Sequence, residues 1–400
     1  MNIFKRFYCR VYQGAFRLMI PILPYRQPKQ LANCQDIVYA LQDHKIKSVL
    51  LVTDRGIRSL GLTDQLEDEI QENKIALHVY DKTVANPTTQ NVEEALAMYK
   101  EGECQAIIAF GGGSAMDCAK ATGARVARPK KSLNKMKGVL RVGKKIPLLI
   151  AVPTTAGTGS ETTLAAVITD SETRHKYAIS DFPLIPSYAA LIPELTLGLP
   201  KHITSTTGMD ALTHAVEAYI GRSTTKETRR RAVEATKAIF ANIETAYNDG
   251  KNMKARENML KAAYSAGIAF TVSYVGYVHA IAHSLGGKYN IPHGLANAII
   301  LPYVLKKYGT KIHKKLWKLG IAAGLFGKRT PYEMGAKLFI EKIEELNKNM
   351  GIGTSIPEIV EEDIPALAKT AEKEGNPLYP VPVLWTTKEL EEIYREVKNG

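Results

Sequence analysis

Short hydrophobic runs alternate with helix-like segments over the first half of the chain. The runs SVLLV, AIIAF and LLIAV each continue directly into a polar or glycine-rich turn. They occupy Ser48–Val52, Ala106–Phe110 and Leu148–Val152, and helix-like segments at Asn91–Lys100 and Asp117–Ala127 separate them. Such alternation is typical of a mostly parallel sheet with helices on both faces. The pattern therefore predicts an α/β domain over residues 35–200, whose ligand binds at the carboxyl ends of the strands.

Past about residue 200 the spacing of hydrophobic positions becomes helical, and convincing strand runs disappear. Apolar residues recur every three to four positions in five segments, at Asp210–Tyr219, Lys226–Ala246, Ala255–Phe270, Ile312–Leu325 and Tyr332–Lys348. A chain of 400 residues exceeds the size at which one hydrophobic core stops growing. We therefore predict a second, all-helical domain over residues 201–400, and an N-terminal extension over residues 1–34.

The N-terminal extension has the pattern of an amphipathic helix. Its apolar residues at helical spacing are Phe4, Phe7, Tyr8, Val11, Ala15 and Leu18, and basic or polar residues fill the other face. Arg10 and Arg17 interrupt the continuous apolar stretch that a secretory signal needs. Two interpretations remain: a helix that lies on a membrane surface, and a helix docked on its own domain or on a partner subunit. We favour docking on protein.

The composition is that of an ordinary globular protein, with 45% hydrophobic and 23% charged residues. No apolar run approaches the roughly 20 residues that span a bilayer, so we expect no transmembrane segment. The four cysteines are widely spaced and form no CxxC pair. This spacing argues against a disulfide framework and against a zinc–thiolate site. A cytoplasmic location is the simplest expectation.

The net charge of +13 raises the alternative of a nucleic-acid-binding protein. Part of the excess lies between residues 130 and 145, at Lys130, Lys131, Lys135, Lys137, Arg141, Lys144 and Lys145. That stretch has almost no aromatic residues to stack on bases and matches no nucleic-acid-binding motif. We interpret it as a solvated basic loop and expect no nucleic-acid partner, with polyanion binding as the alternative.

Three polar turns follow the three predicted strands. In Gly111-Gly112-Gly113-Ser114, glycines let the backbone approach a pyrophosphate and the next helix supplies N–H groups, although a plain tight turn has the same glycines. Asp54 has the chemistry to bind both adenosine ribose hydroxyls, although an N-cap for the next helix is the simpler explanation. The third turn, residues 153–161, is rich in glycines and hydroxyls. Three such turns on one sheet favour a nucleotide site.

The helical half contains a cluster of metal-ligand residue types. Asp210 and His214 are four residues apart, and His279 and His283 repeat that spacing, so each pair projects from one helix face. His293 follows in a PHG turn. One carboxylate and several imidazoles suit Fe²⁺ or Zn²⁺, and the absence of a Glu between the paired histidines excludes the HExxH zinc-protease motif. A lone histidine is usually structural, and spacing alone leaves open which four of the five residues coordinate.

These motifs resemble the iron-containing (group III) alcohol dehydrogenase family. The resemblance runs, in order and spacing, through GGGSAMDCAK (111–120), PTTAGTGSETT (153–163), TGMDALTHAVEAY (207–219) and HAIAHSLGGKYNIPHGLANAIILP (279–302). It covers about residues 35 to 305, and the amphipathic N-terminus lies outside the common pattern. The resemblance implies a dehydroquinate synthase-like fold, in which a Rossmann-like nucleotide-binding domain precedes an all-α metal-binding domain.

The resemblance also implies a role for individual residues. The implied metal ligands are Asp210, His214, His279 and His293. His283 falls beside the nicotinamide and substrate, as a catalytic residue, and Asp54 occupies the acidic position of NAD-preferring members. The other implied cofactor-binding residues are Gly112, Gly113, Ser114, Asp117, Thr154, Thr155, Thr163, Lys176 and Leu195.

The expected activity is hydride transfer between a small alcohol or diol and NAD(H), with Fe²⁺ or Zn²⁺ as Lewis acid. His283 is expected to relay the proton, because an imidazole titrates near neutral pH. The expected partners are a small alcohol or aldehyde and further copies of the chain, as a homodimer or higher homo-oligomer. Two alternatives share the superfamily: a zinc polyol (glycerol-type) dehydrogenase and a hydroxyacid–oxoacid transhydrogenase.

Overall fold

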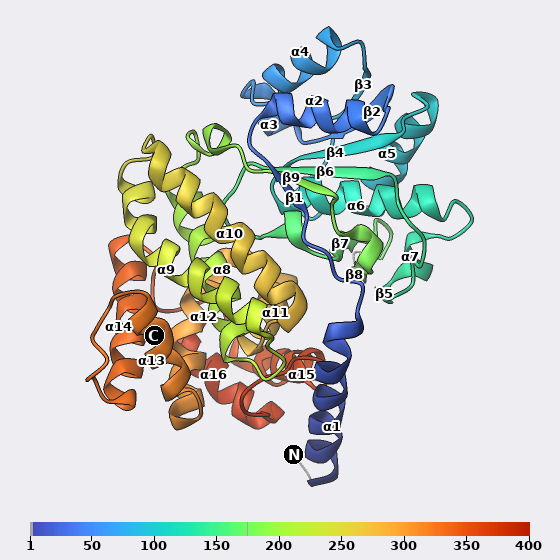
Figure 1. Ribbon diagram of the computed structural model, residues 1–400. Coiled ribbons are helices and arrows are strands. Elements are labelled where there is room, and N and C mark those ends of the chain that lie inside the picture. The colour runs from blue at the N-terminus through green and yellow to red at the C-terminus, as the bar shows by residue number, and fades with distance from the viewer. Residues whose placement is uncertain (1–2, 174) are drawn as a thin grey trace. The chain divides into compact units, whose positions relative to one another are not determined.

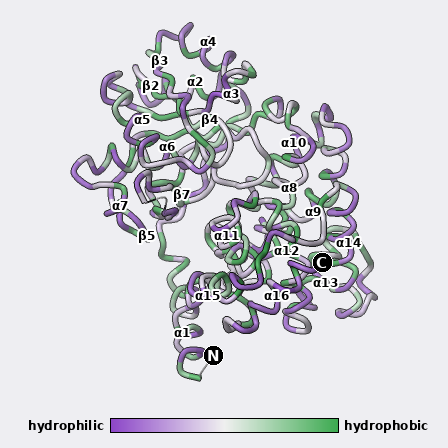
Figure 2. The backbone as a smooth tube through the Cα atoms, turned by 180° about the vertical axis from the view of Figure 1, so that it is seen from behind, coloured by the Kyte–Doolittle hydropathy of each residue, from purple (hydrophilic) through white to green (hydrophobic). Residues whose placement is uncertain are grey.

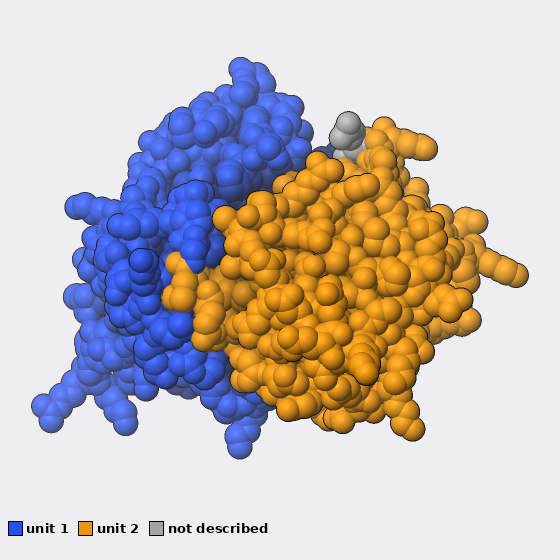
Figure 3. Space-filling view, turned by 90° about the horizontal axis from the view of Figure 1, so that it is seen from above, with its two compact units in different colours: residues 1–23, 198–400 blue, residues 24–197 orange. Residues whose placement is uncertain are grey.

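The computed structural model describes residues 3–173 and 175–400 and divides the chain into two compact units (Figures 1 and 3). Unit 1 comprises Met1–Leu23 and Gly198–Gly400, and unit 2 comprises Pro24–Leu197. The chain thus passes between units at residues 23–24 and 197–198. That the two halves are independent domains over the expected ranges stays a prediction.

Unit 2 is built on a six-stranded parallel sheet with helices on both faces (Figure 1). In spatial order the strands are β1 (Lys29–Leu31), β9 (Tyr188–Ala190), β6 (Leu148–Pro153), β4 (Ala106–Gly111), β2 (Ser48–Val52) and β3 (Ala76–Tyr80). The three strands expected from the sequence are β2, β4 and β6, which are neighbours in the sheet. Because all pairs are parallel, the turns after these strands lie at one edge, as expected.

The alternation of side chains along each strand explains why both faces of the sheet are covered. In β2, Val49 and Leu51 pack under α2 (Cys34–Asp43) and α4 (Asp64–Glu72). Leu50 and Val52 point to the opposite face, under α5 (Thr89–Glu101) and α6 (Gly113–Ala127). All four side chains are fully buried. Because both faces of a parallel sheet are covered, the sequence of β2 is a continuous hydrophobic run over these four residues.

A second, three-stranded sheet in unit 2 has no counterpart in the sequence-based expectation. Its strands, in spatial order, are β5 (Gly138–Val139), β8 (Lys176–Ser180) and β7 (Ala165–Thr169). Ala166 and Ile168 of β7 pack into the same core as α6. The remaining short elements of unit 2 are α3 (Arg55–Ser59), α7 (Leu133–Met136), η2 (Ser160–Thr162), η3 (Phe182–Leu184) and η4 (Pro193–Thr196).

Unit 1 contains helices and no strand among its described residues. Its elements are α1 (Ile3–Met19), η1 (Ile20–Ile22), α8 (Lys201–Ile220), α9 (Lys226–Asn248), α10 (Met253–Ser273), α11 (Tyr277–Tyr289), α12 (His293–Tyr308), η5 (Gly309–Lys311), α13 (His313–Ala322), α14 (Tyr332–Asn349), η6 (Glu361–Asp363), α15 (Ile364–Gly375) and α16 (Thr387–Asn399). All five predicted helices are present. The predicted fold class, an α/β part followed by an all-helical part, is confirmed.

Helix α8 is the central element of unit 1, packed against α9, α10 and α12. It begins nine residues before the predicted segment. The prediction missed this first part because Lys201–Thr207 are mostly polar and lack the apolar periodicity of a core-facing helix. Gly208 permits the close packing, since a Cβ there would lie 2.7 Å from Ile243 Cδ1 and 2.9 Å from Met259 Cε. Among the described residues, only α10 and α11 taken together, bent by 100° at their junction, have the length and apolar content of a bilayer-crossing helix, and no single helix does.

Candidate metal centre and nucleotide pocket

Four side chains of unit 1 converge on one point. The candidate ligand atoms of Asp210, His214, His279 and His293 all lie within 4.8 Å of one another. The first two are one turn apart on α8, whereas His279 comes from α11 and His293 is the first residue of α12. Nε2 of His214, His279 and His293 lies 4.0, 3.8 and 3.5 Å, respectively, from Asp210 Oδ1. Ligands about 2.1 Å from a tetrahedral ion are separated by about 3.4 Å, so this group fits a divalent cation.

Burial keeps the imidazole of His279 in the neutral state that a metal requires. Asp210, His214 and His279 are buried, and His293 is half-exposed. Burial holds the pKa of His279 well below its usual value, and the neighbouring His214, His293 and His283 lower it further. A neutral ring retains the lone pair that binds a cation. The donor set, one carboxylate with three imidazoles, suits Fe²⁺ or Zn²⁺.

Glu217 contacts the ring nitrogen of His279 that faces away from the cluster, and the sequence did not lead us to predict it. Its Oε2 lies 2.6 Å from His279 Nδ1 and accepts a bond of 2.8 Å from Gly276 N, while Oε1 accepts one of 2.8 Å from Val278 N. Burial raises the pKa of Glu217 to about 7, against the lowering effect of these backbone donors. The carboxylate fixes the ring so that Nε2 faces Asp210. The sequence did contain a pattern that could have identified Glu217, because positions 210, 214 and 217 share one face of α8.

Asn297 is a second residue that the sequence reasoning missed. Its Nδ2 donates to Asp210 Oδ1 at 2.7 Å and lies 3.2 Å from His279 Nε2 and 3.0 Å from His293 Nε2. Its Oδ1 is buried and has no hydrogen-bond partner among the described residues. A buried, unsatisfied oxygen beside converging ligand atoms is consistent with a site for a cation or polar ligand. Asn297 follows His293 by one helical turn, a spacing that could have identified it.

His283 lies beside the four-residue group but outside it. Its ring stacks on that of His293, with centroids 5.1 Å apart, and its side chain is 44% exposed. Glu374 Oε1 lies 2.6 Å from His283 Nδ1 and accepts a bond of 2.6 Å from Tyr379 OH. Although burial alone would raise the pKa of Glu374, the nearby charge of His283 and these hydrogen bonds lower it. Glu374 is 91 residues away in sequence, and no local pattern indicates it.

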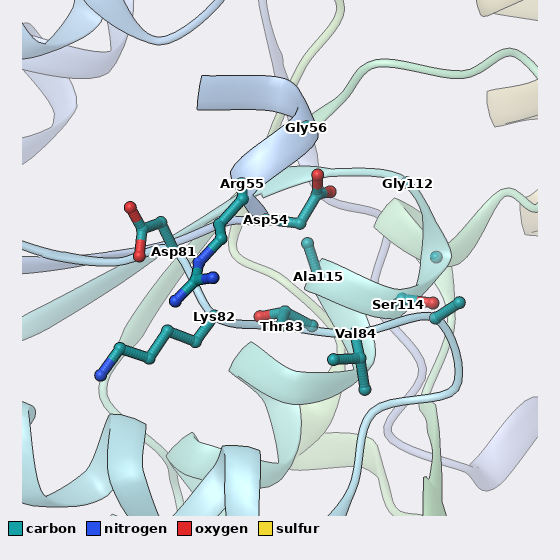
Figure 4. A pocket seen from close by; sticks show the side chains of 12 residues that line it. Asp54, Arg55, Gly56, Asp81, Lys82, Thr83, Val84, Gly112, Ser114 and Ala115 are labelled. Atoms are coloured by element: carbon teal, nitrogen blue, oxygen red, sulfur yellow. The ribbon is translucent and has the colours of Figure 1, made fainter. Parts of the chain in front are cut away.

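A pocket of about 680 Å³ lies at the strand-end edge of unit 2 (Figure 4). Four of the predicted cofactor residues line it, namely Asp54, Gly112, Gly113 and Ser114. The segment Asp81–Ala85, which follows β3, also lines it and was not predicted. Gly111 has φ +146°, and a Cβ there would lie 2.9 Å from the Cβ of Ala115, so this turn requires glycine.

Asp54 caps a helix and also borders the pocket, and its binding of the adenosine ribose hydroxyls stays a prediction. Its Oδ1 accepts a bond of 2.9 Å from Ile57 N, which makes it the N-cap of α3. Its carboxylate also borders the pocket, on the side opposite Thr83 and Val84 (Figure 4). Capping uses one oxygen, and the other is directed towards the turn at Gly111.

The other predicted cofactor residues lie outside the set that lines this pocket: Asp117, Thr154, Thr155, Thr163, Lys176 and Leu195. Asp117 is half-buried and accepts a bond of 3.3 Å from Ser160 Oγ, and its desolvation raises its pKa to about 6. Thr163 Oγ1 accepts a bond of 2.7 Å from Lys120 Nζ. Lys176 donates to Asn86 at 2.7 Å.

The remaining three belong to turns and the core. Thr154 is buried at the end of β6, and its N–H donates to Gly111 O at 3.1 Å. The side chain of Thr155 flanks the glycine turn, 3.8 Å from where a Cβ of Gly112 would lie. Leu195, in η4, packs against the core under α2.

The buried Lys120 anchors the end of the third turn and the residues that follow it. Its Nζ donates to Ser160 O at 2.7 Å, to Thr163 Oγ1 at 2.7 Å and to Ala165 O at 3.0 Å. One cation therefore ties α6 to the whole segment from η2 to β7. Burial lowers the pKa of Lys120 to about 8, partly offset by the charges of Asp117 and Glu161. Lys120 was within a recognised motif, but its anchoring function was not predicted.

Comparison with known proteins places the geometry in context. Two family models match, "Iron-containing alcohol dehydrogenase" over residues 28–193 and "Fe-containing alcohol dehydrogenase family, C-terminal" over residues 204–397. The 1,3-propanediol dehydrogenase of Citrobacter freundii is 38% identical over 88% of this chain and 91% of its own. A crystal structure of a 1,3-propanediol oxidoreductase superimposes with a TM-score of 0.89 at 34% identity, covering 93% and 99%. That of sulfoacetaldehyde reductase from Bifidobacterium kashiwanohense in complex with NAD⁺ gives 0.83 at 28%, covering 94% and 98%.

Proposed function

This chain belongs to the iron-containing alcohol dehydrogenase family and is an NAD-dependent oxidoreductase acting on CH–OH groups, and we propose that its substrate is a small alcohol or diol. The proposed ligands of its divalent ion, Fe²⁺ or alternatively Zn²⁺, are Asp210, His214, His279 and His293. The observation that supports this proposal most is the convergence of these four side chains on one point. A relative named for 1,3-propanediol supports short diols as the substrate class.

The chain's own residues would prepare the site for substrate. A divalent ion bound there would supply a Lewis acid that lowers the pKa of an alcohol hydroxyl. Asp210 provides the one negative charge, and burial keeps His279 neutral. Glu217 holds the ring of His279 in the orientation in which Nε2 faces Asp210. This fixed arrangement orients the alcohol for hydride transfer.

We assign the proton-carrying function to His283. Its exposed ring can exchange a proton with solvent, and Glu374 fixes its orientation through Nδ1. The test is His283→Asn with the metal content measured in parallel. We expect a large loss of turnover and an altered pH profile at unchanged metal content. Full activity at every pH would remove His283 from the mechanism.

For the nucleotide, we propose that the turn at Gly112, Gly113 and Ser114 holds the pyrophosphate of NAD(H). These residues line the pocket at the N-terminus of α6, where N–H groups and the helix dipole favour an anion. Asp54 would bind the adenosine ribose hydroxyls and repel a 2′-phosphate. The predicted residues outside the pocket lining, Asp117, Thr154, Thr155, Thr163, Lys176 and Leu195, stay proposals for the rest of the cofactor.

The experiment that tests the function is anaerobic purification, elemental analysis and a panel of short alcohols and diols with NADH formation as the readout. His279→Ala and His293→Ala should each lower the bound metal. His202→Ala, an exposed histidine on α8, is the matched control and should retain it. Undiminished metal in both ligand variants would refute the site. Turnover of a hydroxyacid and an oxoacid without free NADH would instead establish a transhydrogenase. The cytoplasmic location stays a prediction.

A further inference from the structure

Helix α1 is docked along one face on the rest of unit 1, the part formed by Gly198–Gly400. Cys9 and Gln13 are 1% and 4% exposed. Gln13 Nε2 donates to Tyr379 O at 2.7 Å, and Arg10 donates to Val381 O at 2.8 Å. The expected docking of this helix on its own part of the protein is therefore present. These polar bonds fix which side of α1 faces outwards.

The opposite face of α1 is a stripe of exposed, large apolar side chains. Phe4, Phe7 and Leu18 are 80%, 70% and 78% exposed, and Val11 lies between them. At 100° per residue these four positions fall within an arc of about 60°. Hydrophobic and hydrophilic residues alternate along the helix, which lies along one side of unit 1 beside α15 (Figures 1 and 2). An exposed apolar patch of this kind marks an interaction surface.

The charge of α1 selects an anionic partner. The helix contains Lys5, Arg6, Arg10 and Arg17 and no acidic residue. Arg6 and Arg17 are exposed and lie on one flank of the apolar stripe, about 80–100° around the helix from its nearest residues. A second copy of the same helix would place like charges against each other, whereas an anionic lipid surface provides both opposite charge and an apolar layer for the phenyl rings.

The length of α1 fits a helix that lies in a membrane surface and does not cross it. Seventeen residues rise about 25 Å, and three arginines fall within that length. The family match begins at residue 28, so α1 precedes the part of the chain that the family fold uses. A segment outside that part can acquire a docking function without disturbing the catalytic fold.

We propose that α1 docks the enzyme on anionic lipid bilayers, with Phe4, Phe7, Val11 and Leu18 inserted at the interface. Arg6 and Arg17 contact the lipid headgroups. The proposal is independent of the metal site and of the alcohol substrate. It places the enzyme at a membrane surface as a peripheral protein.

The test is co-sedimentation of the full chain with phosphatidylcholine vesicles, without and with phosphatidylserine. We expect binding to the anionic vesicles at least about tenfold tighter than to the neutral ones. Changing Phe4, Phe7 and Leu18 together to Gln should weaken binding at least about tenfold, because the apolar anchor is lost while Gln remains a good helix former. The control replaces two exposed apolar residues of α14 in the same way, Met334→Gln with Leu338→Gln, and should bind as wild type.

Three outcomes would overturn the proposal. The first is no sedimentation with either vesicle type, and the second is equal binding to both. The third is dissociation of an oligomer in the triple variant, measured by analytical ultracentrifugation, without any vesicle binding by the wild type. That third result would identify the stripe as an interface between copies. NADH formation and metal content should be unchanged in the triple variant, so a failure of the proposed activity is seen separately.

Discussion

Replacing Glu217 with Gln is the sharpest test of how the metal centre is held. The wild-type carboxylate receives three contacts, from the N–H groups of Gly276 and Val278 and from His279 Nδ1. A carboxamide has one accepting oxygen, so its NH₂ must face at least one of these donors. One unsatisfied buried N–H costs about 1–3 kcal/mol of folding free energy. We therefore expect Glu217→Gln to unfold at a lower urea concentration.

The same change should weaken metal binding. Residues that orient a metal-ligating histidine typically contribute 10–100-fold to affinity, or about 1.4–2.7 kcal/mol. The measurement is the dissociation constant for Zn²⁺ or Fe²⁺ by chelator competition. Glu374→Gln is the matched control, since it removes the carboxylate beside His283 and should leave metal affinity unchanged. An affinity of Glu217→Gln within threefold of wild type, with the same unfolding midpoint, would refute the reasoning.

Three further changes probe the nucleotide half. Burial lowers the pKa of Lys120 from 10.5 to about 8, so the unfolded chain binds more protons between these values and stability from this group rises with pH. Between pH 8 and 10.5, the free energy of unfolding in urea should rise by up to about 3 kcal/mol more for wild type than for Lys120→Met. A difference between the two proteins that does not change with pH would contradict this. Gly111→Ala should weaken NADH binding at least about tenfold in a binding titration, because φ is +146° and the new Cβ would lie 2.9 Å from the Cβ of Ala115. The control Gly353→Ala places its Cβ in open space and should bind NADH as wild type does. Asp54→Asn retains an oxygen that can accept the capping bond from Ile57 N, so the free energy of unfolding should be unchanged. Because the negative charge is lost, kcat/KM for NADPH should rise about tenfold relative to that for NADH. An unchanged ratio of the two kcat/KM values would show that Asp54 does not select the cofactor.

Most of the elements that position the site follow from local sequence patterns. Apart from Ser48, the runs at β2, β4 and β6 are apolar because both of their faces are buried, and a buried parallel strand has that pattern. Helix α1 was predicted from its spacing alone, as was the pairing of Asp210 with His214 on one face. The second sheet of unit 2 was not predicted, because its strands are two to five residues long and half-buried.

The sequence by itself determined the alternation of strands and helices, the residue types able to bind a divalent ion, and the family resemblance. Only the tertiary structure decided that Glu217 faces His279 and that Glu374 faces His283. It also decided which side of α1 is covered. The physical reason is that a helix period specifies neighbours three or four residues apart, whereas these contacts join side chains 62 and 91 positions apart in the sequence. Such contacts depend on how whole helices pack.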